Sequence, residues 1–316
     1  MTEQAFNAVF ANPDLCGGLR IPAAAPEKFR AISDKQRVLD AASARGLAVP
    51  RQVVLRNPRD AEHLDQSTLQ FPLVLKPSRS VAASDDRQLK LGVVHCRDSE
   101  ALTAELTKLP ATAYPLLLQQ RIVGPGVGVF LLMWDGEVIA TFSHRRIREK
   151  PPAGGVSVYR ESVLADPTLV EKSRQLLDHF EWQGVAMVEF KLDEATGTPY
   201  IMEINGRFWG SLQLAIDAGV DFPSLLIARA LGQNASAAPD YKIGIRSKWE
   251  WGEVDHFLAR LRRNDKELSL PPGFPGRLSS VLRLLVPWRP GDRFEVLRLS
   301  DPAPFLRESA QYFRRS

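Results

Sequence analysis

The sequence predicts a mixed α+β fold in which most strands pair antiparallel. Two hairpins carry this prediction, because Asp135-Gly136 separates two short apolar runs and residues 193–197 separate two more. Apolar residues at helical spacing occur before the first hairpin and between the two. Since helices and strands do not alternate regularly, we do not expect a doubly wound parallel sheet.

The composition is that of a globular protein with two or three structural units. The 316 residues are 44% hydrophobic and 25% charged, which excludes a disordered chain. No apolar run reaches the ~18–20 residues that a membrane helix needs, and no secretory signal is visible. We therefore expect a cytoplasmic protein without an integral membrane segment. Cys16 and Cys96 have no partner spacing for a zinc or redox motif, and two cysteines exclude a disulfide scaffold.

The net charge of +4 is small, and its surplus lies near the end of the chain. Residues 239–316 contain 15 basic and 10 acidic residues. Nucleic-acid-binding proteins concentrate such an excess in a basic stripe. Here the charges are spread out, which is typical of a solvated surface, so we expect no nucleic-acid partner.

The first half of the chain opens with polar, proline-punctuated residues 1–25. A helical stretch follows, with Ser33 or Asp34 as an N-cap and Gly46 as the stop. The later segments are short and bounded by turn residues. We expect strands at 53–55, 71–77, 89–96 and 116–120, a polar loop at 78–87 and a helix at 99–109.

The second half contains both hairpins. Pro167 after Asp166 is a typical helix start, and the apolar face of that helix runs to Phe180. Gly219 and Pro223 interrupt a later helical pattern. We expect hairpin strands at 129–134, 138–143, 185–192 and 200–205, a broken helix at 209–232, a helix near 254–263 and strands at 281–286 and 294–299.

The second hairpin carries the most informative side chains. Because side chains alternate along a strand, we expect one face of the first strand to carry Val185, Met187, Glu189 and Lys191. One face of the partner strand should carry Ile201, Glu203, Asn205 and Arg207, with Glu189 opposite or diagonal to Glu203. Two such carboxylates repel unless a positive charge lies between them. Apolar neighbours indicate a half-buried strand pair, and hard oxygen ligands of this kind suit magnesium. The alternative is a surface hairpin with two ordinary glutamates.

Two lysines are candidates for phosphate contacts. Lys76 follows an apolar strand and precedes a proline, and Lys35 begins the predicted helix after Asp34. Each taken alone has the ordinary explanation of a surface lysine. Beside a magnesium site, both become candidates for binding a triphosphate. The chain contains neither a P-loop nor a dinucleotide-binding glycine motif.

The ordered set of these motifs resembles the ATP-grasp superfamily, and within it the carboxylate–amine ligase-like proteins akin to the large chain of carbamoyl-phosphate synthase. The resemblance covers roughly residues 30–235. Its motifs are Ser33-Asp34-Lys35, Val74-Leu75-Lys76-Pro77, Gln119-Gln120-Arg121-Ile122-Val123-Gly124, Met187-Val188-Glu189-Phe190 and Met202-Glu203-Ile204-Asn205-Gly206-Arg207-Phe208.

The resemblance implies an ATP-grasp fold, with ATP between two α+β subdomains whose antiparallel sheets enclose a cleft. It also implies a ligase that activates a small carboxylate as an acyl phosphate for attack by an amine. The implied roles are phosphate contacts for Lys35 and Lys76, an adenine pocket at Gln119, Gln120, Arg121 and Ile122, Mg²⁺ or Mn²⁺ binding by Glu189, Glu203 and Asn205, and contact of Arg207 with the transferred phosphate.

The family pattern divides the chain into four expected parts. These are an N-terminal extension with the leading helix at 1–50, a small subdomain at 51–120, a large subdomain at 121–235 and a basic C-terminal subdomain at 236–316. ATP-grasp ligases generally carry a substrate-binding domain of about a hundred residues before this point. We expect either a differently built pocket, a protein partner that supplies the domain, or an incomplete chain.

A second departure concerns Gly206, which stands where the family usually has proline. Glycine keeps the ligand geometry possible and allows more backbone freedom. If the absence of the N-terminal domain removes catalysis, the alternative is an ATP-binding regulatory or scaffold protein.

Three arginines precede a glycine-rich loop and form a candidate substrate site. Arginine suits bidentate binding of carboxylate or phosphate, and alternation places His144, Arg146 and Arg148 on one side of the strand. ATP-grasp enzymes resembling this chain have a substrate loop here. The alternative is a charged hairpin end with ordinary ion pairs. The candidates for substrate contact are Arg146, Arg148, Gly154, Gly155 and Ser157.

The C-terminal segment interleaves arginines with apolar residues. Such a pattern is typical of a packed subdomain, and the alternative is a surface that docks on an anionic membrane or an acidic partner. The arginines concerned are Arg277, Arg283, Arg289, Arg293 and Arg298.

Overall fold

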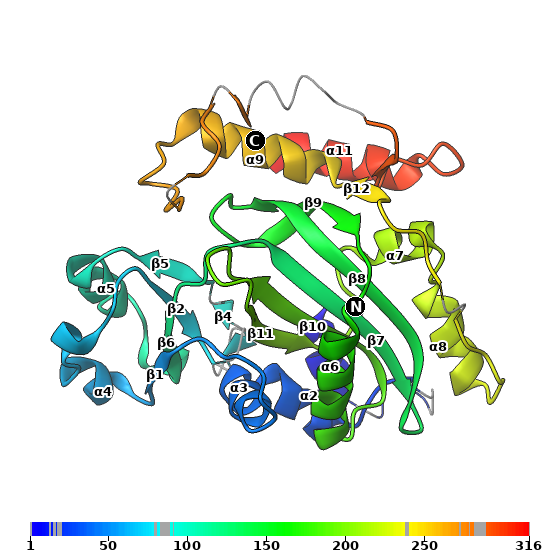
Figure 1. Cartoon of the computed structure of the whole chain (residues 1–316), viewed down its shortest axis with the longest axis horizontal. Helices are drawn as coiled ribbons and strands as arrows, with labels where there is room; N and C mark the ends of the chain where they lie inside the picture. The colour runs from blue at the N-terminus through cyan, green and yellow to red at the C-terminus, as the bar shows by residue number, and fades with distance from the viewer. Residues whose placement is uncertain are drawn as a thin grey trace.

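Two sheets, one of four strands and one of seven, organise the chain (Figure 1). The smaller sheet lies at one end of the molecule and the larger sheet occupies its centre. At the top of the view, α9 and α11 lie next to β9 and β12 of the larger sheet. The computed structural model describes residues 2–12, 14, 17, 21–78, 81–82, 89–90, 92–237, 240–271, 273–277, 279–280 and 289–315.

The smaller sheet is antiparallel throughout, in the order β1-β6-β2-β5. The buried residues Leu55, Leu75, Leu102 and Leu118 form its core with α5. The predicted strand at 89–96 is wrong in its extent, because two short strands replace it. The elements of this region are β1 (Gln52–Leu55), α4 (Pro58–Glu62), β2 (Leu73–Pro77), β3 (Val81–Ala82), β4 (Leu89–Lys90), β5 (Val94–Cys96), α5 (Ser99–Leu106) and β6 (Leu116–Gln120). The rest of the predicted loop 78–87 lies largely outside the described residues.

The larger sheet has the order β11-β10-β7-β8-β9-β12-β13. Its strands pair antiparallel except β12 and β13, which are parallel. Asp135 and Gly136 both have positive φ, of 50° and 80°, as the predicted tight turn requires. The strands are β7 (Gly126–Trp134), β8 (Glu137–Lys150), β9 (Val156–Ser162), β10 (Gly184–Leu192), β11 (Pro199–Asn205), β12 (Arg246–Lys248) and β13 (Asp292–Phe294).

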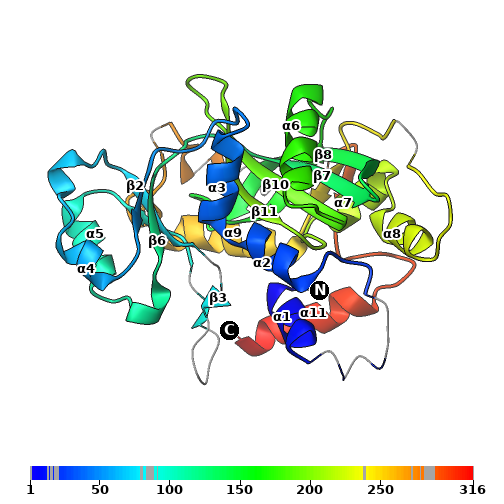
Figure 2. The ribbon, with the colours of Figure 1, turned by 90° about the horizontal axis from the view of Figure 1, so that it is seen from below.

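Helices cover both faces of the larger sheet. One face packs against α2 (Pro26–Ser33), α3 (Lys35–Ser43) and α6 (Pro167–His179) through a buried apolar cluster. Seen from below, α2 and α3 lie in front of β10 and β11 (Figure 2). The other face packs Val185 and Met187 against α7 (Leu212–Ala218) and α8 (Phe222–Ala230). The helix predicted from Pro167 and the broken helix are both confirmed.

The two ends of the chain differ most from the prediction. Residues 1–25 contain the helix α1 (Glu3–Ala11), whose Phe6 packs 5.0 Å from the ring of Phe29. The helix near 254–263 is confirmed as α9 (Glu250–Arg262), but the predicted strand at 294–299 is wrong beyond Phe294. The strand predicted at 281–286, with Arg283, lies outside the described residues.

The last helix, α11 (Ala303–Arg315), was not predicted by the sequence analysis. It packs on α9, where Trp251 stacks 4.2 Å from the ring of Tyr312. Arg298 pairs with Asp217 at 2.7 Å, which is the behaviour expected of a packed subdomain. Among the described helices, none combines the length and apolarity needed to cross a bilayer.

Candidate active site

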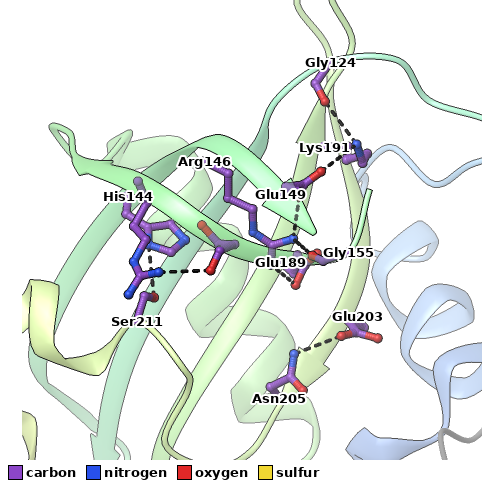
Figure 3. Close-up of polar contacts among 12 residues, drawn as sticks. Gly124, His144, Arg146, Glu149, Gly155, Glu189, Lys191, Glu203, Asn205 and Ser211 are labelled. Carbon is purple, nitrogen blue, oxygen red and sulfur yellow. Dashed lines mark hydrogen bonds and ion pairs between the residues drawn. The ribbon is translucent and has the colours of Figure 1, made fainter. Parts of the chain in front are cut away.

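The second hairpin places two glutamates face to face. Glu189 of β10 pairs directly with Glu203 of β11, as the alternation of the hairpin predicts. Asn205 donates a hydrogen bond of 3.0 Å from Nδ2 to Oε1 of Glu203. Figure 3 shows these three side chains on the same side of the hairpin. The sheet therefore gathers three oxygen-bearing side chains at one place.

A β-bulge corrects one detail of the predicted face. The register of the hairpin shifts between Glu189 and Phe190, so that Phe190 pairs with Ile201. Ile201 and Ile204 both lie in the core on the α2–α3 side. The expectation that Ile201 shares a face with Glu203 is therefore wrong, because a bulge adds one residue to β11 and re-aims the side chains around it.

Two lysines from different elements approach Glu203. Asp34 caps α3 by accepting hydrogen bonds from the backbone of Gln36 and Arg37, which places Lys35 at the first helical position. Its Nζ lies 3.2 Å from Oε2 of Glu203. Lys76, near the end of β2, is buried, and this burial is the main reason that its pKa falls to about 8. Both sheets thus contribute to one charged cluster.

The two carboxylates have opposite electrostatic environments. Burial raises the pKa of Glu189, and the charge of Glu203 adds to this effect, although Arg146 opposes it. Burial also acts on Glu203, but the charges of Lys35 and Lys76 outweigh it and lower its pKa. Glu203 is therefore the carboxylate held more firmly in its ionised form.

Arg207 lies at the end of the hairpin, beside a small cavity. Its Nη2 donates to Oδ1 of Asn205 at 3.2 Å, and its Nη1 donates to the carbonyl of Phe208 at 3.0 Å. The cavity of about 20 Å³ is also lined by Lys35 and Glu203. It holds no more than a water molecule or two.

Close packing explains the glycine at position 206, which the sequence analysis did not foresee. A Cβ at this position would lie 2.3 Å from Cδ1 of Ile32 and 2.4 Å from Cη2 of Trp182. Both neighbours are buried. The glycine is therefore required by close approach of the α2 core, and backbone freedom is not needed to explain it.

A larger cavity of about 310 Å³ lies beside Arg146 and Glu149. Arg121 and Ile122 line it from the segment after β6, and the C-terminal part contributes Pro271, Gly273, Phe274 and Pro275. Gln119 and Gln120 are oriented differently, since Gln119 donates to Gln52 at 2.7 Å and Gln120 accepts from Arg51 at 3.4 Å. Of the four adenine-pocket candidates, Arg121 and Ile122 therefore line the cavity, and Gln119 and Gln120 are not among its lining residues.

The five substrate-loop candidates separate into two groups. Arg146 and Gly155 contact each other beside Glu189, whereas Arg148, Gly154 and Ser157 have other neighbours. Arg146 bonds Glu189, and Gly155 accepts from Arg146 through its carbonyl oxygen at 3.2 Å. Arg148 lines the larger cavity but is hydrogen-bonded to Glu253 of α9 and stacks 4.4 Å above the ring of Tyr159. The remaining two candidates are Gly154 beside His95 of β5, and Ser157, whose carbonyl accepts from Arg160.

Two charged residues of this site were missed by the sequence analysis as candidates. Glu149 accepts from Arg146 at 2.9 Å, and Lys191 donates to the carbonyl of Gly124 at 3.1 Å (Figure 3). Strand alternation places Lys191 on the same face as Glu189 in the sequence analysis, but the lysine was not taken as a site candidate. Register shifts flank Arg148 in the β8–β9 pair, so simple alternation could not place Glu149.

In the part of the chain that the structure describes, no three His, Cys, Asp or Glu side chains gather as a metal cage. Glu189, Glu203 and Asn205 offer two carboxylates and one amide oxygen. This donor set suits Mg²⁺, which typically takes one or two carboxylates and completes its shell with phosphates and waters.

Comparison with known proteins identifies the architecture. A family model described as ATP-grasp in the biosynthetic pathway with Ter operon matches residues 112–252. The curated proteins contain no match to the chain. Solved structures do match, and those described below are 16–21% identical to this chain.

Three of these structures illustrate the similarity. An L-amino acid ligase from Bacillus licheniformis has a TM-score of 0.54 at 21% identity, over 72% of this chain and 55% of that one. The biotin carboxylase domain of a Hydrogenobacter thermophilus 2-oxoglutarate carboxylase, solved with MgADP and bicarbonate, gives 0.58 at 20%, over 75% and 54%. N5-carboxyaminoimidazole synthase from Aspergillus clavatus, solved with ADP and 5-aminoimidazole ribonucleotide, gives 0.59 at 16%, over 75% and 61%. This chain thus spans somewhat more than half of each of those chains.

Proposed function

The chain has the ATP-grasp fold, and we propose that it is an ATP- and Mg²⁺-dependent ligase that activates a small carboxylate as an acyl phosphate for attack by an amine. One observation carries the proposal. Glu189, Glu203 and Asn205 converge on one side of a hairpin, and Lys35 and Lys76 approach the same point from α3 and the smaller sheet. Anionic oxygens beside two lysines suit a metal-bound triphosphate.

The donor set fits a magnesium ion, and Mn²⁺ would suit the same oxygens. Glu189, Glu203 and Asn205 would hold it. Glu203 is the carboxylate held more firmly in its ionised form, because the charges of Lys35 and Lys76 lower its pKa against the effect of burial. When bound, the ion neutralises charge on the phosphates of the nucleotide.

The chain's own residues would act by positioning and charge. Lys35 and Lys76 would hold phosphate oxygens, and Arg207 would contact the transferred phosphate. Phosphoryl transfer asks the protein mainly for these functions and needs no covalent nucleophile. Arg121 and Ile122 would line the nucleotide pocket in the larger cavity, and Arg146, Arg148 and the loop at 154–157 would meet the substrates.

The substrate class rests on the relatives alone. One is named an L-amino acid ligase, and another was solved with bicarbonate and MgADP. A small carboxylate as acceptor of the phosphoryl group and an amine as nucleophile agree with the first of these names. The same reaction is what the resemblance of the sequence implies.

Phosphate release tests the proposal. Purified protein is incubated with ATP, MgCl₂ and a panel of small carboxylic acids, with and without amines. The proposal expects phosphate release that requires both substrates together, and mass spectrometry should find the corresponding amide. Nucleotide binding without turnover under every combination would contradict the ligase and support a regulatory ATP-binding protein instead.

A further inference from the structure

Arg146 is held from three sides in the centre of the site. Its Nη2 donates to Oε2 of Glu189 at 2.5 Å, and its Nη1 donates to Glu149 at 2.9 Å and to the carbonyl of Gly155 at 3.2 Å (Figure 3). The Arg146 side chain is 10% exposed. Its guanidinium is therefore fixed before any ligand binds.

The sheet itself makes room for this arginine. Arg146 lies on β8 and Glu189 on β10, so the side chain must cross the intervening strand β7. It crosses at Gly126, where a Cβ would lie 2.6 Å from Cδ of Arg146 and 3.1 Å from its Nε. A side chain at position 126 would block this path. The contact between Arg146 and Glu189 is thus built into the backbone of the sheet.

The two glutamates have separate cations. Glu203 has Lys35 and Asn205 as partners, whereas Glu189 is paired with Arg146. Within the described residues, the hydrogen bonds of Glu189 engage Oε2 and leave Oε1 without one. Because carboxylates at a cross-strand pair repel, Arg146 also draws Glu189 into a defined orientation beside Glu203.

We propose that Arg146 is a positioning residue for the metal site, and that its bond to one oxygen of Glu189 presents the other oxygen to the divalent cation. This inference rests on the proposed function, because it takes Glu189, Glu203 and Asn205 as the metal ligands. It assigns Arg146 a role toward a metal ligand, in addition to the substrate contact proposed above. Residues that orient a metal-binding carboxylate typically contribute about 10- to 100-fold to metal affinity.

The opposite role, competition with the metal, is disfavoured by the same contacts. To release Glu189, the guanidinium would have to leave Glu149 and Gly155 as well, or stay buried with its charge only partly matched. Leaving a buried charge without its partner is costly. A fixed arginine that keeps Glu189 in place requires no such movement.

The test measures Mn²⁺ binding to the protein in the presence of ADP, by the electron paramagnetic resonance signal of free Mn²⁺. Arg146→Gln removes the guanidinium, and Gly126→Ala displaces it while every charged group remains. We expect both variants to weaken Mn²⁺ binding by about 10- to 100-fold. The matched controls Arg145→Gln, on the exposed face of the same strand, and Gly210→Ala, where a Cβ meets nothing within 4 Å, should bind as the wild type does.

The outcomes separate this inference from the function on which it rests. If the wild type binds no Mn²⁺ with ADP, or if Glu203→Gln binds it normally, the proposed metal site fails. If the wild type binds Mn²⁺ and Glu203→Gln does not, but both Arg146→Gln and Gly126→Ala bind with unchanged or higher affinity, only the role of Arg146 is overturned. Circular dichroism establishes that each variant is folded. If Arg146→Gln does not fold, the Mn²⁺ affinity of Gly126→Ala still decides the role of Arg146.

Discussion

At the scale of single residues, the proposed chemistry depends on charges that compensate one another. Glu203 is the centre of this balance, since Lys35 lies 3.2 Å from it and Lys76 also lowers its pKa. Neutralising this one carboxylate would remove a proposed metal ligand and the negative charge that compensates Lys35 and Lys76. We therefore expect a loss of the Glu203 charge to impair the proposed reaction even when the side-chain volume is unchanged.

Glu203→Gln tests this balance without changing side-chain volume. We expect Mg²⁺-dependent ATP turnover to fall by at least ~10²-fold, because one charged metal ligand is lost. Phosphate release is the measurement, and a far-ultraviolet circular dichroism spectrum establishes the fold. Glu137→Gln, on an exposed residue beside the first hairpin turn, is the matched control. Near-normal turnover in a folded Glu203→Gln protein would contradict the assignment of the site.

Lys76 gives the site a pH dependence. Its pKa is lowered to about 8, first by burial and then by the charge of Lys35, while Glu203 and Glu189 act in the opposite direction. The lysine is charged below this pKa and loses its proton above it. The affinity of the free protein for ATP should therefore fall roughly tenfold between pH 7 and pH 9.

A pair of substitutions isolates this effect. Lys76→Arg keeps a positive charge throughout this range and should remove the decline in ATP affinity, whereas Lys76→Ala should weaken binding at every pH. Fluorescent nucleotide titration measures the affinities. An ATP affinity that is unchanged in Lys76→Ala, or a decline that persists in Lys76→Arg, would exclude the phosphate role of Lys76.

At the scale of elements, the hairpin β10–β11 was predictable and its surroundings less so. The positions of Glu189 and Glu203 followed from strand alternation and from a turn at 193–197, which are local properties. The bulge that turns Ile201 to the core has no local signature. Neither has Glu149, because its position depends on register shifts in the pairing of β8 with β9. Long-range pairing decided these details, and a single sequence does not contain it.

Helices near the two ends of the chain differ in how far the sequence analysis predicted them. Asp34 caps α3, and the helix begins where this residue predicts. The helix ends at Ser43 with Ala44 as its C-cap, two residues before Gly46, whose φ is positive. In contrast, α1 and α11 depend on tertiary contacts, such as Phe6 with Phe29 and Trp251 with Tyr312. The sequence of α1 is mainly apolar and that of α11 is amphipathic at helical spacing, so local signals for both helices existed and the sequence analysis did not use them.

The junction of β11 and α2 depends on the missing side chain at Gly206. Gly206→Ala would place its Cβ against Ile32 and Trp182, which are buried and cannot move freely. We expect the free energy of unfolding to fall by about 1–3 kcal/mol, as overpacked cores do. Urea denaturation measures the change. Gly210→Ala, with open space around its Cβ, should leave stability nearly unchanged, and equal stability of both variants would contradict the packing explanation.

At the scale of the whole molecule, the site joins parts of the chain that fold into different sheets. The backbone N–H of Lys35 donates to the carbonyl of Ser78 at 2.9 Å, and the hydroxyl of Ser78 donates to Asp34 at 2.9 Å. These bonds link α3, which packs on the larger sheet, to the end of β2 in the smaller one. A ligand that contacts Lys35, Lys76 and the hairpin would therefore add a second link between the two sheets.

Ligand binding should accordingly stabilise the entire chain. A ligand at about 100 times its dissociation constant adds ~2.7 kcal/mol to the free energy of unfolding, which raises the melting temperature by roughly 5 °C. We expect this shift with ATP and MgCl₂ together, and a smaller shift with ATP alone, because the metal ligands then remain unused. Differential scanning fluorimetry provides the measurement. In Glu203→Gln, MgCl₂ should add nothing to the shift that ATP causes. A magnesium-dependent shift that survives this substitution would show that the metal binds away from the hairpin. The link between the two sheets would then not depend on the proposed metal site.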